Sequence, residues 1–284
     1  MKMKNSNNLN IKIFNQLTQL FMDKFSNLPE NIAEKLFNRI SNLLGSLDIK
    51  EQITILQLFE KVEYFSILDY EMLLVDVIKK MLLVLDTKNI IFTPLISQRV
   101  QREVKSSMLV TYLFKSNVIK YEFPNSSFQF SYKTDLIERE IINLNNKNKK
   151  LAIVDDFIGT GHSALEAARY FIDQGVKKEK IIFVSLVTLT EGETILQNHN
   201  YQYFYAKKSL TLKEHTHDLT EDQKNQFYND IKIISEKIKV NNKGEFLGYH
   251  ESEALISMIR TPNNSLNILW EGVNSENTPF PRIK

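Results

Sequence analysis

Apolar residues recur at intervals of three and four positions through the first third of the chain. The interval is clear at Ile13, Leu17 and Leu20, and it places apolar side chains on one face of a helix. Glycine occurs in this part only at Gly45, and Pro29 stands where a helix would begin. The pattern predicts four amphipathic helices, at residues 11–25, 29–45, 50–65 and 69–85.

After residue 86 the pattern changes to short β-branched runs separated by polar or helical segments. A continuous apolar run such as residues 181–187 is typical of a strand buried on both faces of a parallel sheet. A helix predicted at residues 164–174 separates two such runs, which makes a β-α-β unit. The predicted strands are residues 89–93, 151–154, 181–187, 201–205 and 254–259.

The two patterns predict two domains. Residues 1–86 form an all-helical module, and residues 87–284 form an α/β domain with a mostly parallel sheet flanked by helices. A helical insertion at about 207–242 precedes the last predicted strand. The first module carries apolar stripes but no convergent polar cluster, so we expect it to serve packing, oligomerisation or contact with a partner.

The composition of the chain argues against several classes of function. The formal net charge is only +2, which lacks the cationic excess of a protein held mainly on nucleic-acid phosphates. The absence of cysteine excludes disulfides, a thiolate nucleophile and cysteine-ligated zinc. Residues 72–85 are interrupted by Asp76, Lys79 and Lys80, and no signal peptide is recognisable, so we expect a cytoplasmic protein without a membrane span.

Candidate chemistry is concentrated in residues 151–174, where a buried strand is followed by two acids, a glycine turn and a helix. Gly159 and Gly161 permit backbone angles that let the following amides converge on an anion. Asp155 and Asp156 stand at the end of the strand, placed to accept hydrogen bonds from vicinal hydroxyls or to hold Mg²⁺. The segment therefore predicts a site for a phosphorylated sugar.

Two other interpretations of this segment are open. Adjacent acids before a glycine turn can form a solvated loop. Ser163 and Glu166 also have the spacing of a capping box. Capping and phosphate binding can coexist, although Glu166 would slightly oppose an anion.

Residues 154–163, Val-Asp-Asp-Phe-Ile-Gly-Thr-Gly-His-Ser, resemble the signature of the type I phosphoribosyltransferases. That signature is an apolar strand, two acids, three variable residues and Thr-Gly-x-Thr/Ser. The resemblance implies a Rossmann-like fold that binds phosphoribosyl pyrophosphate (PRPP). It assigns the ribose hydroxyls and catalysis to Asp155 and Asp156. It assigns the 5′-phosphate to the turn residues Gly159, Thr160, Gly161, His162 and Ser163.

The carboxyl end carries a second resemblance. Residues 260–270, Arg-Thr-Pro-Asn-Asn-Ser-Leu-Asn-Ile-Leu-Trp, are followed by Pro-Phe-Pro-Arg at 279–282. This ending, with the helical start and the D-D-F-I-G-[ST]-G core, is similar to that of the phosphoribosyltransferase-like proteins of bacterial conflict systems (PRTase-CE). The resemblance implies an antiphage setting, in some cases beside a retron-type reverse transcriptase with its nucleic acid.

Two interpretations remain for Asn263 and Asn264. Thr-Pro-Asn-Asn after a strand forms a turn, since proline fixes φ and asparagine tolerates left-handed geometry. Alternatively, these amides bind a base or sugar at the carboxyl edge of the sheet. Trp270 is interpreted as a packing anchor.

Other parts of a type I transferase are less distinct. Cations suited to a leaving pyrophosphate follow the first core strand at Arg99 and Arg102. Residues 124–133 are a candidate for the mobile catalytic lid. His215 and His217 are interpreted as exposed loop residues and not as zinc ligands.

Two functional hypotheses follow. In the first, the protein is an enzyme that uses Mg²⁺, held by Asp155 and Asp156, in pentosyl transfer or cleavage of a nucleotide N-glycosidic bond. It would act as an effector of a conflict system. In the second, the glycine turn of residues 159–163, called the cradle below, binds PRPP or a nucleotide without catalysis. The bound ligand then gates a partner. A homo-oligomer or a conflict-system partner is expected in either case.

Overall fold

The computed structural model divides the chain into two compact units. One comprises residues 1–66 and 210–284, and the other comprises residues 67–209. The parts described below are residues 9–86, 89–95, 105–126, 128–131, 138–238, 246–272 and 276–282.

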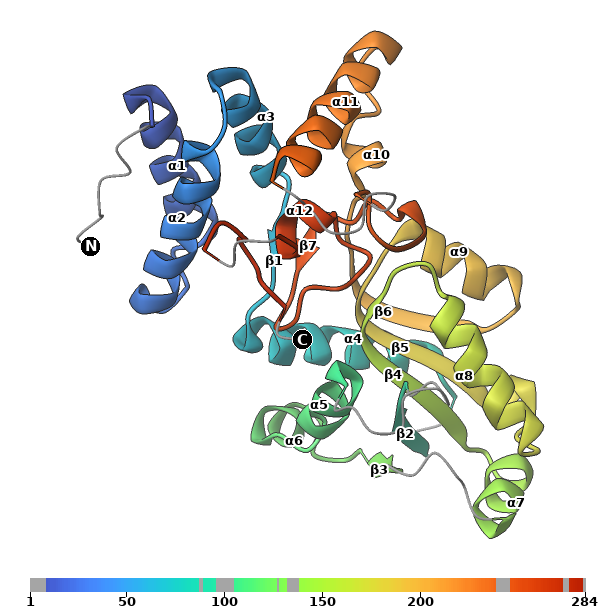
Figure 1. Cartoon of the computed structure of the whole chain (residues 1–284). Helices are drawn as coiled ribbons and strands as arrows, with labels where there is room; N and C mark the ends of the chain where they lie inside the picture. The colour runs from blue at the N-terminus through green and yellow to red at the C-terminus, as the bar shows by residue number, and fades with distance from the viewer. Residues whose placement is uncertain are drawn as a thin grey trace. The chain divides into compact units, whose positions relative to one another are not determined.

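The unit of residues 67–209 is built on a five-stranded sheet in which every neighbouring pair is parallel (Figure 1). The strands follow the order β3-β2-β4-β5-β6. They are β2 (Ile90–Pro94), β3 (Phe128–Phe130), β4 (Lys150–Ile158), β5 (Ile181–Thr188) and β6 (Gln202–Lys208). β5 is buried along its whole length, as its continuous apolar sequence predicts.

Helices cover both faces of this sheet. On one face, alanines of α8 and Phe171 pack on Leu151, Ile153 and Phe183, and α7 and α9 contribute to the same cluster. On the other face, α4 contacts β5 and β6, and α5 contacts β2 and β4. The helices of this unit are α4 (Ile67–Val84), α5 (Ser106–Leu113), α6 (Asn117–Glu122), α7 (Glu138–Asn146), α8 (His162–Asp173) and α9 (Thr190–Asn198), with the 3-10 turn η1 (Lys178–Lys180).

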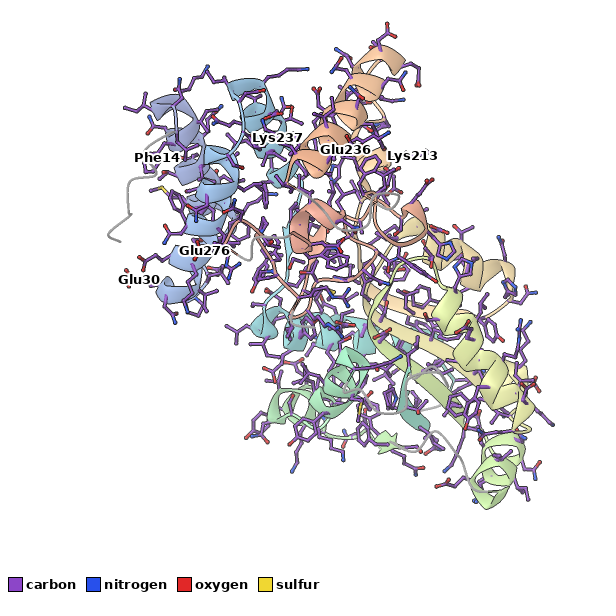
Figure 2. All side chains as sticks on the ribbon, viewed as in Figure 1. Phe14, Glu30, Lys213, Glu236, Lys237 and Glu276 are labelled. Carbon is purple, nitrogen blue, oxygen red and sulfur yellow. The ribbon has the colours of Figure 1, made fainter. Side chains whose placement is uncertain are left out.

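The other unit joins the first three helices to the carboxyl-terminal part of the chain. Its elements are α1 (Ile11–Lys24), α2 (Glu30–Gly45), α3 (Ile49–Phe59), β1 (Glu63–Tyr64), α10 (Leu212–His215), α11 (Glu221–Lys237), η2 (Tyr249–Glu251), β7 (Ile256–Ser257) and α12 (Asn267–Trp270). Phe14, labelled in Figure 2, packs edge-on against Phe37 at 5.8 Å. Lys237 binds the Oε2 atom of Glu51 at 2.6 Å. Phe37 lies in the core of this unit with Phe14 packed against it, whereas the Lys237–Glu51 pair lies at the surface.

The compact units divide the chain at other positions than the domains expected from the sequence. The fourth helix, α4, contacts the parallel sheet and lies in the same compact unit, which begins at residue 67, whereas the expected domain boundary is at residue 86. Residues 210–284 belong with α1, α2 and α3, because Ile231, Leu255 and Leu269 are buried in the same core as those helices. The role of the helices as an interface stays a prediction.

Two predicted elements differ in the structure. The helix predicted at residues 50–65 ends at Phe59, and Glu63–Tyr64 forms a strand instead. The strand predicted at residues 254–259 is shortened to Ile256–Ser257 and pairs with Glu63–Tyr64 in a separate two-stranded sheet. Backbone hydrogen bonds from Glu63 to Leu255 and from Phe65 to Ser257 explain both differences.

The candidate lid is also partly a strand. Phe128–Phe130 pairs in parallel with β2. The rings of Phe128 and Phe130 lie 5.2 and 6.0 Å from that of Phe92, which is fully buried. These contacts anchor the middle of the segment, whereas residues 127, 132 and 133 lie outside the described residues.

Candidate functional site

The predicted phosphosugar site lies where the direction of the sheet connections reverses. From β2 the chain moves to β3 at one edge, and from β4 it moves through β5 to β6 at the other. β2 and β4 are neighbours, with Pro94 opposite Val154. In an open parallel sheet, ligands bind beyond the carboxyl ends of the two strands at such a point. Asp155 and Asp156 stand at that end of β4.

The turn after β4 presents the amino terminus of α8 without a side-chain cap. Gly161 is the N-cap residue, with φ of +79° and ψ of −7°, a left-handed conformation that favours glycine. No side chain in the described part of the chain caps this terminus. The first backbone N–H groups of a helix lack partners within the helix, so these groups are available to an anion.

The N-cap position also corrects one interpretation from the sequence. Ser163 is the second residue of α8, and Gly161 is the residue before the helix. Ser163 and Glu166 therefore do not form a capping box, because the box requires its serine at the N-cap. Ser163 and His162 are exposed. Thr160 is buried, and its Oγ1 lies 3.0 Å from the Nδ1 atom of His162.

Close packing against α9 holds the turn in place. A Cβ atom on Gly161 would lie 2.5 Å from Cγ2 of Ile195. A Cβ atom on Gly192 would lie 2.5 Å from the carbonyl oxygen of Gly159. Gly192 thus allows the backbone of the turn after β4 to pass close to α9. Gly192 was not identified from the sequence. The signal that could have indicated it is a glycine inside a helical pattern.

Asp156 is fixed by two hydroxyl groups from the α4 and α5 face of the sheet. Its carboxylate is buried, with 5% of the residue exposed. The hydroxyl of Tyr70 donates to Oδ2 at 2.9 Å, and that of Ser106 donates to Oδ1 at 2.7 Å. Tyr70 lies 86 positions away in sequence, in a helix that sequence analysis treated as packing only.

Of the two acids, Asp155 is the more accessible. Its side chain is partly exposed, and its Oδ1 accepts a hydrogen bond from the amide of Asp156 at 2.9 Å. Burial and the neighbouring charge of Asp156 raise the pKa of Asp155 well above its ordinary value, although Lys105 acts in the opposite direction. A group that donates hydrogen bonds or carries positive charge would stabilise the ionised form.

Four other predicted site residues are not among the described residues of this unit. Arg99 and Arg102 belong to residues 96–104, which lie outside the described residues. Outside that segment, Ser107 Oγ donates to the carbonyl of Leu95 at 3.0 Å. Asn263 and Asn264 belong to the other compact unit.

Asn264 has the contacts of a residue that holds a turn. Its Nδ2 donates to Ser252 Oγ at 3.0 Å, and its carbonyl accepts the amide of Ala254 at 3.1 Å. Gly248, at φ of +85°, passes so close that a Cβ atom would lie 2.3 Å from the Asn264 carbonyl oxygen. These contacts favour the structural interpretation of Asn264. A binding role for Asn263 or Asn264 stays a prediction.

Comparison with family models matches residues 44–282 to the PRTase-CE family. The chain belongs to the PRTase-CE family. This confirms the relationship predicted from residues 154–163 and from the carboxyl-terminal ending, and the phosphoribosyltransferase-like α/β fold is confirmed by the parallel sheet and its flanking helices. A helical region precedes that sheet, as the sequence predicts.

Other comparisons add little to the assignment of this PRTase-CE chain. No curated protein matches it. Among solved structures it is similar to the AQ2163 protein from Aquifex aeolicus, with 13% identity and a TM-score of 0.31. That similarity covers 63% of this chain and 86% of the other. In the described part of the PRTase-CE chain, no helix has both the length and the apolar content to cross a membrane.

Proposed function

We propose that this PRTase-CE protein binds PRPP or a 5′-phosphorylated nucleotide and acts on the bond at its anomeric carbon. The proposal rests on the amino terminus of α8, which no described side chain caps. Its N-cap residue, Gly161, has a left-handed conformation. The paired acids at the end of β4 precede this turn. In this proposal the 5′-phosphate binds the amides of residues 160–163. The ribose hydroxyls donate to Asp155.

In this proposal Asp155 and Asp156 have different roles. Tyr70 and Ser106 hold the carboxylate of Asp156, so Asp156 acts as a rigid negative charge behind Asp155. Asp155 then receives the sugar at a fixed position, and positioning of this kind lowers the barrier to a reaction at the adjacent carbon. A developing oxocarbenium-like ribose would be stabilised by the negative charge of this pair.

The donor set also fits Mg²⁺ at one of its two acids. Asp155 carries a charge that burial and Asp156 make unfavourable, and Mg²⁺ takes carboxylate oxygens. Asp155 is thus the residue proposed to hold the ion. Both oxygens of Asp156 already accept hydrogen bonds, which makes Asp156 the weaker ligand. When bound, Mg²⁺ would neutralise charge on a departing pyrophosphate.

The biological setting is part of the proposal. The family resemblance supports an effector in a bacterial antiphage system, beside a retron-type reverse transcriptase in some cases. The second hypothesis is a sensor that binds the same ligand without turnover and gates a partner. It is retained because Arg99 and Arg102, the predicted pyrophosphate contacts, have no sharp motif around them.

Calorimetric titration with PRPP and with AMP, each with and without Mg²⁺, tests the binding step. Binding of at least one of them, strengthened by Mg²⁺, is expected, and no heat with either would refute the proposal. Product analysis across a panel of nucleotides and PRPP–base pairs then separates the hypotheses. Release of pyrophosphate or free base supports the enzyme. Ligand-dependent assembly without product, lost in the Asp155→Asn/Asp156→Asn variant, supports the sensor.

A further inference from the structure

A pocket of about 450 Å³ lies in the unit that contains the amino-terminal helices and the carboxyl-terminal segment. Its walls come from α2, from β1 and β7, and from residues 258–261 and 279–282. This volume is within the range of small-molecule sites in proteins. The pocket belongs to a different compact unit from the phosphate turn of β4 and α8.

The lining of this pocket is cationic. Four of the described residues that line it are basic and none is acidic. They are Lys35, Arg39, Arg260 and Arg282. Arg39 also donates from Nη1 to the carbonyl of Thr278 at 3.0 Å, which fixes one wall. Glu30 and Glu276, which Figure 2 labels, are not among the lining residues.

Arg282 has an unmet hydrogen-bonding need. Its Nε is buried and has no hydrogen-bond partner among the described residues. Its guanidinium lies 4.8 Å from the ring centre of Trp270, a cation–π contact that fixes its orientation. Burial and the nearby charge of Arg260 lower its pKa, and Glu271 only partly offsets them. A buried guanidinium donor without a partner is unfavourable, and guanidinium groups bind anionic oxygens strongly.

The pocket also has aromatic and apolar residues in its lining. The rings of Tyr64 and Phe280 are stacked at 5.8 Å with an interplanar angle of 20°, and both line the pocket with Ile32 and Met258. Stacking on an aromatic ring favours a planar group such as a nucleobase. The pocket therefore combines the two surfaces that a phosphorylated, base-containing molecule requires.

The carboxyl-terminal ending of the sequence shapes this lining. Thr261 Oγ1 lies 3.0 Å from Ser257 Oγ on β7 and donates to the carbonyl of Phe280 at 3.4 Å. Trp270 is held by a 3.0 Å hydrogen bond from Nε1 to the carbonyl of Ser265. The Thr-Pro-Asn-Asn turn and the Pro-Phe-Pro-Arg segment thus place Arg260 and Arg282 in the same pocket.

We propose that this pocket is a second ligand site, which binds a nucleotide through its phosphates on Arg260, Arg282 and Lys35 and through its base on Tyr64 and Phe280. The site is separate from the proposed phosphosugar site and does not depend on its chemistry. It gives this protein a way to respond to one nucleotide while the β4–α8 turn binds another ligand.

Calorimetry of the full chain with ADP tests the site, in a Gly161→Ala background that weakens binding at the turn after β4. ADP is expected to bind this background. Lys35→Glu should weaken that binding about tenfold by placing a negative charge at the pocket. Lys12→Glu, an equivalent change at an exposed lysine of α1 outside the pocket, is the matched control and should change nothing. Arg260→Gln/Arg282→Gln should abolish binding.

Two ligand controls identify the chemistry. Adenosine and inorganic pyrophosphate should each bind more weakly than ADP, because each engages one of the two surfaces. The proposal is overturned if ADP does not bind the Gly161→Ala protein, if Lys35→Glu and Lys12→Glu bind it equally, or if pyrophosphate binds as tightly as ADP. Because Lys35 is exposed, its variant remains informative even if the double arginine variant fails to fold.

Discussion

Gly161 is the residue on which the phosphate turn depends. Any side chain there meets two costs, the left-handed backbone at φ of +79° and the approach of Ile195. Gly161→Ala is expected to weaken PRPP binding about tenfold while lowering the free energy of unfolding by only ~1–2 kcal/mol. Calorimetric titration and urea unfolding measure the two effects.

Gly45 provides the matched control for this substitution. It lies at the end of α2, and a Cβ atom there would meet no atom within 4 Å. Gly45→Ala should leave both ligand binding and stability nearly unchanged. If Gly161→Ala and Gly45→Ala bind PRPP equally well, the phosphate site has been assigned to the wrong turn.

Tyr70 is expected to matter through Asp156. Tyr70→Phe removes one of the two hydroxyl donors to a buried carboxylate, which should lower the free energy of unfolding by ~1–3 kcal/mol. Ligand binding should weaken as well, because Asp156 loses its fixed position behind Asp155. Tyr121→Phe is the control, since Tyr121 is 80% exposed on α6. Equal urea midpoints for the two variants would contradict this role of Tyr70.

The contact between α9 and β6 fixes the position of α9, which packs against the turn after β4. Glu193 on α9 accepts a hydrogen bond from the hydroxyl of Tyr205 at 2.7 Å and pairs with Lys208. Burial acts to raise the pKa of Glu193, but these hydrogen bonds outweigh it and leave the pKa below its ordinary value of 4.5. The ionised carboxylate therefore stabilises the fold.

This lowered pKa predicts a pH-dependent effect of Glu193→Gln. A lowered pKa contributes stability above the ordinary value, and that stability is lost as pH falls through the folded-state pKa. The substitution should cost ~1–2 kcal/mol at pH 7 and progressively less below pH 4.5. Thermal unfolding between pH 3 and 8 measures this, with exposed Glu191→Gln as the control. A constant difference across the range would contradict it.

Elements with a strong local pattern were predictable from the sequence. The helices α1, α2 and α4, and the strands β4 and β5, lie within a few residues of their predicted bounds, because the period of apolar residues is a local property. The strand β1 was missed because it has two residues and depends on a partner nearly two hundred positions away. The strand β3 was missed because three residues carry too short a pattern.

The candidate site was predictable only where its residues are contiguous in the sequence. Asp155, Asp156 and Gly161 are contiguous, so their strand-turn-helix context could be recognised in one segment. Tyr70, Ser106 and Gly192 reach that segment only through packing of the sheet and its helices. No spacing in the sequence indicates such contacts.

At the scale of the whole molecule, the sheet unit has its own core and its own hydrogen-bonded sheet. A fragment of residues 67–209 is therefore expected to fold alone and to retain the affinity of the full chain for the phosphorylated ligand. Circular dichroism and calorimetric titration measure this. The same fragment with Gly161→Ala is the control for binding at the cradle. A fragment that is unfolded, or folded but unable to bind PRPP when the full chain binds it, would contradict the independence of this unit.

The division of the chain into residues 1–66, 67–209 and 210–284 also sets an order of events during synthesis. The helices α1, α2 and α3 are made first, but their core includes Ile231, Leu269 and Phe280. The sheet unit is complete once residue 209 has left the ribosome. At about 5–20 residues per second, the first helices wait several seconds for their partners after the cradle has formed. A chain cut short after residue 209 would keep the cradle and expose the apolar faces of α1, α2 and α3.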